Sequence, residues 1–237
     1  VCKANPARVR AFAASEGVRA KTDPIDARMI LAFAKEKKLR PTVAVEPKRK
    51  RLAAYLDRRN HLKEMAAREK NRIQNSPDEI HPLIRRTLKY LAGELKEVER
   101  MIRETICSDR RMNAQVECLK KIKGVGEVTA WTVIAFLGEI DTLTRNQLAA
   151  LAGLAPFNRD SGVFKGKRKI IGGRAKVRMV LYMAARTAAT HNPVIKAYVE
   201  DLRSRGKPYK CAMVAAMRKL LIHMRSELKN LNLELAT

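Results

Sequence analysis

The feature that most restricts the fold is a series of mostly apolar residues that recur alternately every four and every three positions. The series consists of Ile84, Leu88, Leu91, Leu95, Val98, Ile102 and Thr105. Such spacing keeps one helical face apolar at every turn and is typical of a coiled-coil seam. A less regular series precedes it, at Leu52, Leu56, Leu62, Ala66 and Ile73. The segment 75–78, Asn-Ser-Pro-Asp, favours a helix break between the two series. Residues 46–112 are therefore predicted to form two long helices, either as an antiparallel hairpin or as a dimerisation arm.

The rest of the chain also favours helices. Among its 237 residues, 46% are hydrophobic and only 5% are aromatic, and Ala, Leu, Lys, Arg and Glu dominate, which are good helix formers. Short helices are expected near 7–16 and 23–37, before a linker with two prolines, and again after the arm. We predict a mainly α fold with three parts, at 1–45, 46–112 and 113–237.

The net charge indicates the partner. Fifty Lys and Arg against 24 Asp and Glu give a formal charge of +26, and a polyanion relieves the self-repulsion of so many like charges. Phosphate backbones fit this requirement. No apolar stretch is long enough to span a membrane, so a membrane partner is not expected. DNA or RNA is the predicted partner.

The cysteine pattern argues against zinc sites and disulfides. Cys2, Cys107, Cys118 and Cys211 form no C-x-x-C pair, and no histidine lies near them at zinc-finger spacing. Unpaired thiols are typical of a reducing compartment, so a cytoplasmic location is expected.

Two glycines separate a pair of short predicted helices. Gly124 and Gly126 lie in a Gly-Val-Gly turn that leads into an apolar helix at 128–137. A turn of this kind exposes backbone N–H groups to a phosphate, as in a helix-hairpin-helix element. The alternative is that these glycines only permit a tight turn.

A long cationic segment without acids follows. No Asp or Glu occurs between Gly162 and Val199. Its glycines predict a loop that enters a helix N-terminus, where backbone donors and cations together suit a phosphate. The alternative is a solvated surface. The predicted nucleic-acid-binding cations are Lys165, Lys167, Arg168, Lys169, Arg174, Lys176 and Arg178.

Three residues could carry chemistry. Ser161 begins the cationic segment, and its hydroxyl could attack a phosphodiester, although an Asp-Ser-Gly sequence more often only forms a turn. Asp23 and Asp26 share one face of a helix start and could hold Mg²⁺. Alternatively, Asp23 caps that helix and Asp26 favours its dipole.

Several segments together resemble the Piv/MooV-type transposases of bacterial insertion sequences, also called bridge recombinases. The segments that carry the resemblance are 20–28, 122–137, 151–156, 160–168, 172–174, 206–208 and 217–221. The resemblance implies a RuvC-like α/β nuclease domain ending near residue 45, a coiled-coil arm, and a helical transposase domain with a catalytic serine. It further implies that Ser161 forms a transient phosphoserine link to DNA, and that Asp23 and Asp26 are the last two acids of a Mg²⁺-binding tetrad. A structured guide RNA, homo-oligomers and a bacterial, nucleoid-associated location are expected on the same basis.

The sequence departs from this family in one respect. Two further acids of the tetrad are expected upstream of Asp23, where only Glu16 occurs, and Glu16 matches neither position. We therefore expect a truncated or fragmentary member that binds nucleic acid but cuts DNA poorly or not at all. Two other readings stay open: a binding module of the helix-hairpin-helix type without chemistry, and a remnant that dimerises through its coiled coil.

Overall fold

The computed structural model describes residues 2, 4–18, 20, 22–39, 44–157, 160–161, 164–165, 169–170 and 172–234. At strand residues 157, 160, 161, 164, 165 and 169 it describes the backbone alone. The described residues contain ten α-helices and four two-residue strands, which confirms the prediction of a mainly α fold. The chain divides into two compact units, 1–46 and 47–237, and each is treated by itself below.

The first unit is a pair of helices. Helix α1 runs from Pro6 to Ser15 and α2 from Asp23 to Glu36. The Asn5 side chain caps α1 by accepting a hydrogen bond from the backbone N–H of Ala7. The helices pack through Phe12 and Phe33, whose rings meet edge to face with their centroids 5.5 Å apart. The described residues of this unit form no strand, so its kinship to a RuvC-like sheet domain stays a prediction.

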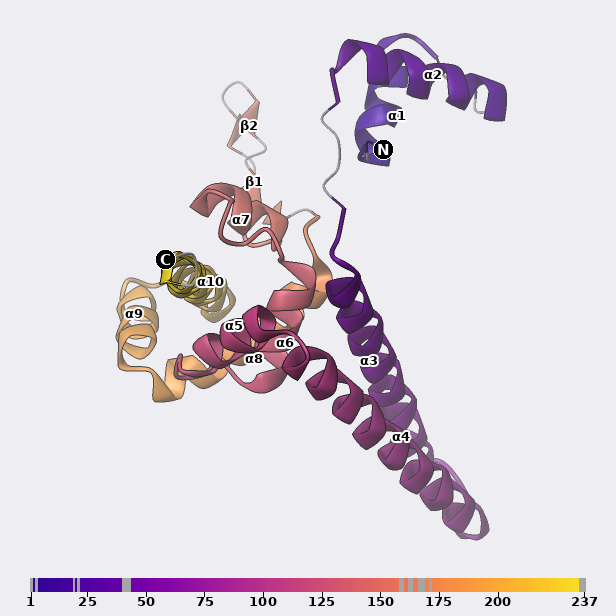
Figure 1. The fold of residues 1–237 in the computed structure, drawn as a ribbon, viewed down its shortest axis with the longest axis vertical. Helices are drawn as coiled ribbons and strands as arrows, with labels where there is room; N and C mark the ends of the chain where they lie inside the picture. The colour runs from indigo at the N-terminus through magenta and orange to yellow at the C-terminus, as the bar shows by residue number, and fades with distance from the viewer. Residues whose placement is uncertain are drawn as a thin grey trace. The chain divides into compact units, whose positions relative to one another are not determined.

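The second unit begins with the predicted arm. Helices α3 (Pro47–Ile73) and α4 (His81–Cys107) lie side by side, joined by a turn that includes the 3-10 helix Asp78–Ile80 (Figure 1). The predicted seam is the packed face, because Leu56 and Leu91 are buried between the helices. Arg59 of α3 donates a 2.8 Å hydrogen bond to Glu99 of α4 beside it. Of the two predicted arrangements, the structure has the antiparallel hairpin within one chain.

A bundle of helices of different lengths continues from the arm. Helix α6 is buried on nearly all sides and packs against α3, α5 and α8. Helix α10 packs against α5, α7, α8 and α9. The helices are α5 (Arg110–Lys120), α6 (Glu127–Phe136), α7 (Arg145–Leu151), α8 (Ala175–His191), α9 (Pro193–Ser204) and α10 (Tyr209–Glu234). One core runs through arm and bundle, because the buried residues of both belong to a single cluster.

Between α7 and α8 the chain forms two short antiparallel ladders. Strand β1 (Pro156–Phe157) pairs with β4 (Lys169–Ile170), and β2 (Asp160–Ser161) pairs with β3 (Phe164–Lys165). The ladders are nested, since β2 and β3 lie between β1 and β4 in the sequence. We call the segment 156–170 the serine hairpin.

None of the helices among the described residues is both long enough and apolar enough to cross a membrane. The four cysteines all fall within the described residues, and all are free thiols.

Candidate functional site

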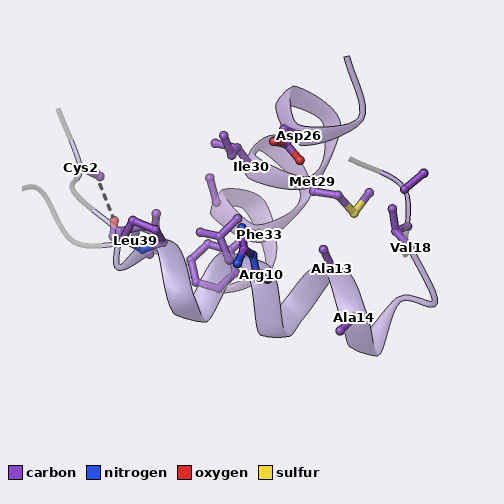
Figure 2. A pocket seen from close by; sticks show the side chains of 15 residues that line it. Cys2, Arg10, Ala13, Ala14, Val18, Asp26, Met29, Ile30, Phe33 and Leu39 are labelled. Carbon is purple, nitrogen blue, oxygen red and sulfur yellow. Dashed lines mark hydrogen bonds between the residues drawn. The ribbon is translucent and has the colours of Figure 1, made fainter. Parts of the chain in front are cut away.

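The two candidate metal-binding acids lie in the first turn of α2. Asp23 is exposed and Asp26 is partly buried. The preceding residue, Thr22, makes no side-chain capping bond, and Pro24 occupies the first turn, where its missing N–H is not needed. Asp26 also borders a pocket of about 890 Å³ lined by residues of α1 and α2, with Met29 and Ile30 beside it (Figure 2). Both carboxylates therefore lie at a helix N-terminus, where negative charge is favoured whether or not a metal binds.

The chemistry of this pair suits Mg²⁺ in part. Magnesium takes oxygen ligands and is commonly held by one or two protein carboxylates, with waters and substrate phosphates filling its other positions. Asp23 and Asp26 supply two such carboxylates. Within the described ranges, no group of three or more His, Cys, Asp or Glu is gathered as a metal site. Asp23 and Asp26 could thus hold a metal only if water, a substrate phosphate or other residues supplied the remaining ligands.

The candidate nucleophile lies in the inner ladder of the serine hairpin. Ser161 pairs with Phe164, and Asp160 pairs with Lys165. Ser161 and Phe164 thus form the inner of the two residue pairs that the structure describes in this ladder. Ser161 and the acids of α2 belong to different compact units.

The predicted phosphate-binding cations fall into three groups. Lys165 and Lys169 are strand residues of the serine hairpin, at β3 and β4. Lys167 and Arg168 lie outside the described residues. The remaining three, on α8 and at its N-cap, each have a partner within the chain: Arg174, Lys176 and Arg178.

The partners of these three cations are specific. Arg174 donates to the backbone oxygen of Phe136 at the end of α6 and, over 2.5 Å, to the Glu139 carboxylate. The Lys176 ammonium lies 2.5 Å from Asp57 of α3, and Arg178 donates 2.9 Å to the backbone oxygen of Gly172. The sequence pattern predicted phosphate binding for these cations, with a solvated surface as the alternative, whereas the structure gives each of them a partner within the chain.

Glu139 shows how strongly Arg174 is engaged. Burial by itself would raise the pKa of Glu139, but the hydrogen bond and charge of Arg174, with the charge of Arg49, lower the pKa below its ordinary value. Arg49 was missed by sequence reasoning. It packs against Gly138, where a Cβ would collide with its guanidinium, and its Nε is buried without a partner among the described atoms. Gly138 is a sequence signal that could have indicated a close approach at this position.

The two glycines of the predicted helix-hairpin-helix turn differ. Gly124 has φ +102°, and a Cβ there would lie 2.6 Å from the Cβ of Ala188 on α8. Gly126 precedes α6, with φ −89° and open space around it. The positive φ and the close packing against α8 both account for a glycine at position 124. The alternative that this glycine permits a tight turn is consistent with them. Gly126 borders a hollow of about 420 Å³ at the start of α6.

Two transposase family models match separate segments of this chain. Residues 116–200 match the model described as "Transposase IS116/IS110/IS902 family". Residues 1–82 match a DEDD-type transposase model of the IS110 elements. Both models describe transposases of the IS110/IS116 type. The first of these matches includes Ser161 and the second includes Asp23 and Asp26, so every candidate catalytic residue lies within a segment shared with this family.

Individual relatives agree with this placement. The pilin gene-inverting proteins of Moraxella lacunata and Moraxella bovis are each 26% identical over 221 residues, covering 92% of this chain and 69% of the relative. An uncharacterized 44.8 kDa protein of the insertion element IS116 from Streptomyces clavuligerus is 29% identical over 134 residues, covering 56% of this chain and 33% of the relative. The chain is therefore similar both to pilin gene-inverting proteins and to a protein of an insertion element.

Proposed function

We propose that this chain belongs to the IS110/IS116 family of transposases and is a DNA recombinase in which Ser161 is the nucleophile that cuts and rejoins DNA. The observation that carries the proposal is that Ser161 lies in the β2–β3 ladder, within a segment whose sequence contains four cations after Asp160. When DNA is bound, the cations of this segment would stabilise the pentacoordinate transition state that forms as the Ser161 hydroxyl attacks a phosphodiester.

The proposed step conserves phosphodiester bonds. The Ser161 Oγ attacks a backbone phosphorus, so a serine–phosphorus bond forms and the bond from phosphorus to one deoxyribose oxygen breaks. The serine proton passes to a solvent base, and the departing sugar oxygen takes up a proton to become a hydroxyl. Attack by another strand's hydroxyl on the phosphoserine reverses the chemistry and joins new partners. No oxidant or energy donor is needed, because the bond energy is kept in the adduct.

The acids of α2 are proposed to bind the metal of the DEDD-type domain. Asp23 and Asp26 would hold Mg²⁺, which supplies positive charge to a phosphate oxygen when bound. The support is their common turn and their oxygen chemistry.

A structured guide RNA and self-association are proposed on the family resemblance, and the charge of +26 supports the first of them. The heptad seam is already filled within one chain. Self-association through the arm would therefore use the outer surface of α3 and α4, where Leu83 and Tyr90 are exposed.

The test is a covalent-adduct assay. The chain is incubated with labelled element-end DNA, element RNA and Mg²⁺, then denatured and separated by electrophoresis. The proposal predicts a protease-sensitive protein–DNA species that is lost in Ser161→Ala. Ser204→Ala, at the end of α9, is the matched control and should retain the adduct. DNA binding without an adduct under all conditions would favour a binding module without chemistry.

A further inference from the structure

A second pocket, apart from the acids of α2, lies at the base of the serine hairpin. Its volume is about 950 Å³, within the range of ligand-binding pockets. Pro156 of β1 and Ile170 of β4 form part of its wall, and α9 and α10 form most of the rest. The strands that contribute these residues are the outer ladder of the hairpin that contains Ser161. We call it the hairpin-base pocket.

The hairpin-base pocket combines an apolar lining with a cationic edge. Leu202, Val214 and Ile222 line it and are only partly buried, so they keep apolar surface open to a ligand. The cations that line it are Lys207, Lys210, Arg218 and Lys219, and none of its described lining residues is acidic. An anion with an attached apolar or aromatic group fits this combination.

One aromatic side chain completes the pocket. Tyr198 of α9 belongs to the lining, and the Lys219 ammonium lies 4.3 Å from the centre of its ring. Proteins that bind single-stranded nucleic acid combine an aromatic side chain, on which a base stacks, with cations that contact the phosphate backbone. When a base takes the ring face, the Lys219 ammonium becomes available to the adjoining phosphate.

We propose that the hairpin-base pocket binds an unpaired deoxynucleotide of the DNA strand on which Ser161 acts. This inference rests on the proposed function, since strand exchange at a serine hairpin requires unpaired DNA beside the cut. The chain's charge of +26 favours a nucleic acid over an acidic peptide. A base in the pocket would hold the strand at the root of the hairpin and so position the phosphodiester for Ser161.

Cys211 provides a direct probe, because it lines the pocket and its thiol is exposed. Cys107, at the end of α4, is exposed and does not line the pocket. The full chain is treated with a small maleimide at several times, digested with trypsin, and the labelling rates of both thiols are measured by mass spectrometry. Saturation by a single-stranded DNA oligonucleotide should slow Cys211 labelling about fivefold or more and leave Cys107 unchanged.

The comparison ligands decide between occupants. Duplex DNA and single-stranded RNA of the same sequence are tested at saturation, which fluorescence anisotropy establishes independently. Equal protection by the duplex, or protection by RNA alone, overturns the proposal. Protection of Cys211 by raising the protein concentration without DNA would assign the pocket to a second copy of the chain. If no nucleic acid binds at all, the proposed function fails; if DNA binds and Cys211 stays reactive, only the pocket proposal fails.

Variants give a second readout. Tyr198→Leu should weaken single-stranded DNA binding about fivefold or more, whereas Tyr198→Phe keeps the ring and should bind like the parent. Lys210→Ala should lower the salt dependence of binding by about one unit of slope. Lys229→Ala, an exposed position on α10 outside the pocket, is the matched control for effects of charge alone. Equal losses in Lys210→Ala and Lys229→Ala would contradict a specific site, provided that melting curves show all variants folded.

Discussion

Arg174, one residue before α8, donates a hydrogen bond of 2.5 Å to the carboxylate of Glu139, which lies just beyond α6. The same guanidinium donates to the backbone oxygen of Phe136, so it satisfies a carbonyl at the C-terminal end of α6. Gly172 and Gly173, between the serine hairpin and Arg174, both have positive φ. Arg174 thus fixes the chain directly after two residues whose backbone conformation favours glycine.

Replacing Arg174 tests this attachment. Arg174→Ala should lower the free energy of unfolding by about 1 kcal/mol, because the pair is more than a third exposed and solvent screens it. Adduct formation by Ser161 should fall by more than the loss of folded protein explains, since the hairpin loses its anchor. Thermal melting and the adduct assay measure the two effects. Arg205→Ala, which removes an exposed ion pair on α9, should change neither; an equal loss in both variants would refute the anchoring role.

Acid should weaken the second unit through two carboxylates. The pKa of Asp109 is lowered, chiefly by the hydrogen bond from the Met112 backbone, with Lys48 adding to it against the effect of burial; the pKa of Glu139 is also lowered. A lowered folded-state pKa means that the stabilisation is present above the ordinary values of 3.8 and 4.5 and is lost as the pH falls through the folded-state values.

Denaturant melts from pH 6 to about pH 3 should therefore show declining stability. The decline should be shallower in the double variant Glu139→Gln, Asp109→Asn. Glu64→Gln, at an exposed position of α3, is the control and should follow the parent. A decline as steep in the double variant as in the parent would rule out this source.

The two glycines before α6 allow packing and nucleic-acid contact to be separated. Gly124→Ala should lower stability by about 2–4 kcal/mol, since it combines a collision with Ala188 with an unfavourable positive φ. Gly126→Ala has room and an ordinary φ, so stability should be nearly unchanged. DNA affinity measured on Gly126→Ala then tests the helix-hairpin-helix prediction. Unchanged affinity would count against close phosphate contact at Gly126, and the packing role would remain for Gly124 alone.

The arm gives a prediction about self-association. Leu91 is 3% exposed inside the hairpin, so Leu91→Asp should destabilise the fold by several kcal/mol and cannot test oligomerisation cleanly. Leu83 and Tyr90 on α4 are 53% and 64% exposed. The double variant Leu83→Ser, Tyr90→Ser should keep its melting temperature and reduce self-association in sedimentation measurements. An oligomer that persists in this variant would exclude this surface of the arm.

The parts of the fold that could be predicted are those set by nearby residues. The seam from Ile84 to Thr105 repeats within one helix, and the break at 75–78 is a local capping signal, so the arm followed from the sequence. The engagement of the cations did not, because Lys176 meets Asp57 from 119 residues away and Arg174 meets Glu139 from 35 residues away. A count of cations in a loop does not distinguish those that bind phosphate from those that join helices. Ser161 was predicted from its place at the start of the cationic segment and from the family resemblance, and its role stays a proposal.

The most direct test of the central claim is to locate the covalent bond. Trypsin cuts after Arg159 and Lys165 and releases residues 160–165, in which Ser161 is the only hydroxyl-bearing residue. The chain is reacted with element-end DNA, RNA and Mg²⁺, digested with nuclease and trypsin, and analysed by tandem mass spectrometry. Ser161 attack predicts this peptide with a nucleotide phosphate on the serine. A nucleotide on any other residue, or DNA cut and rejoined while this peptide stays unmodified throughout the reaction, would contradict it.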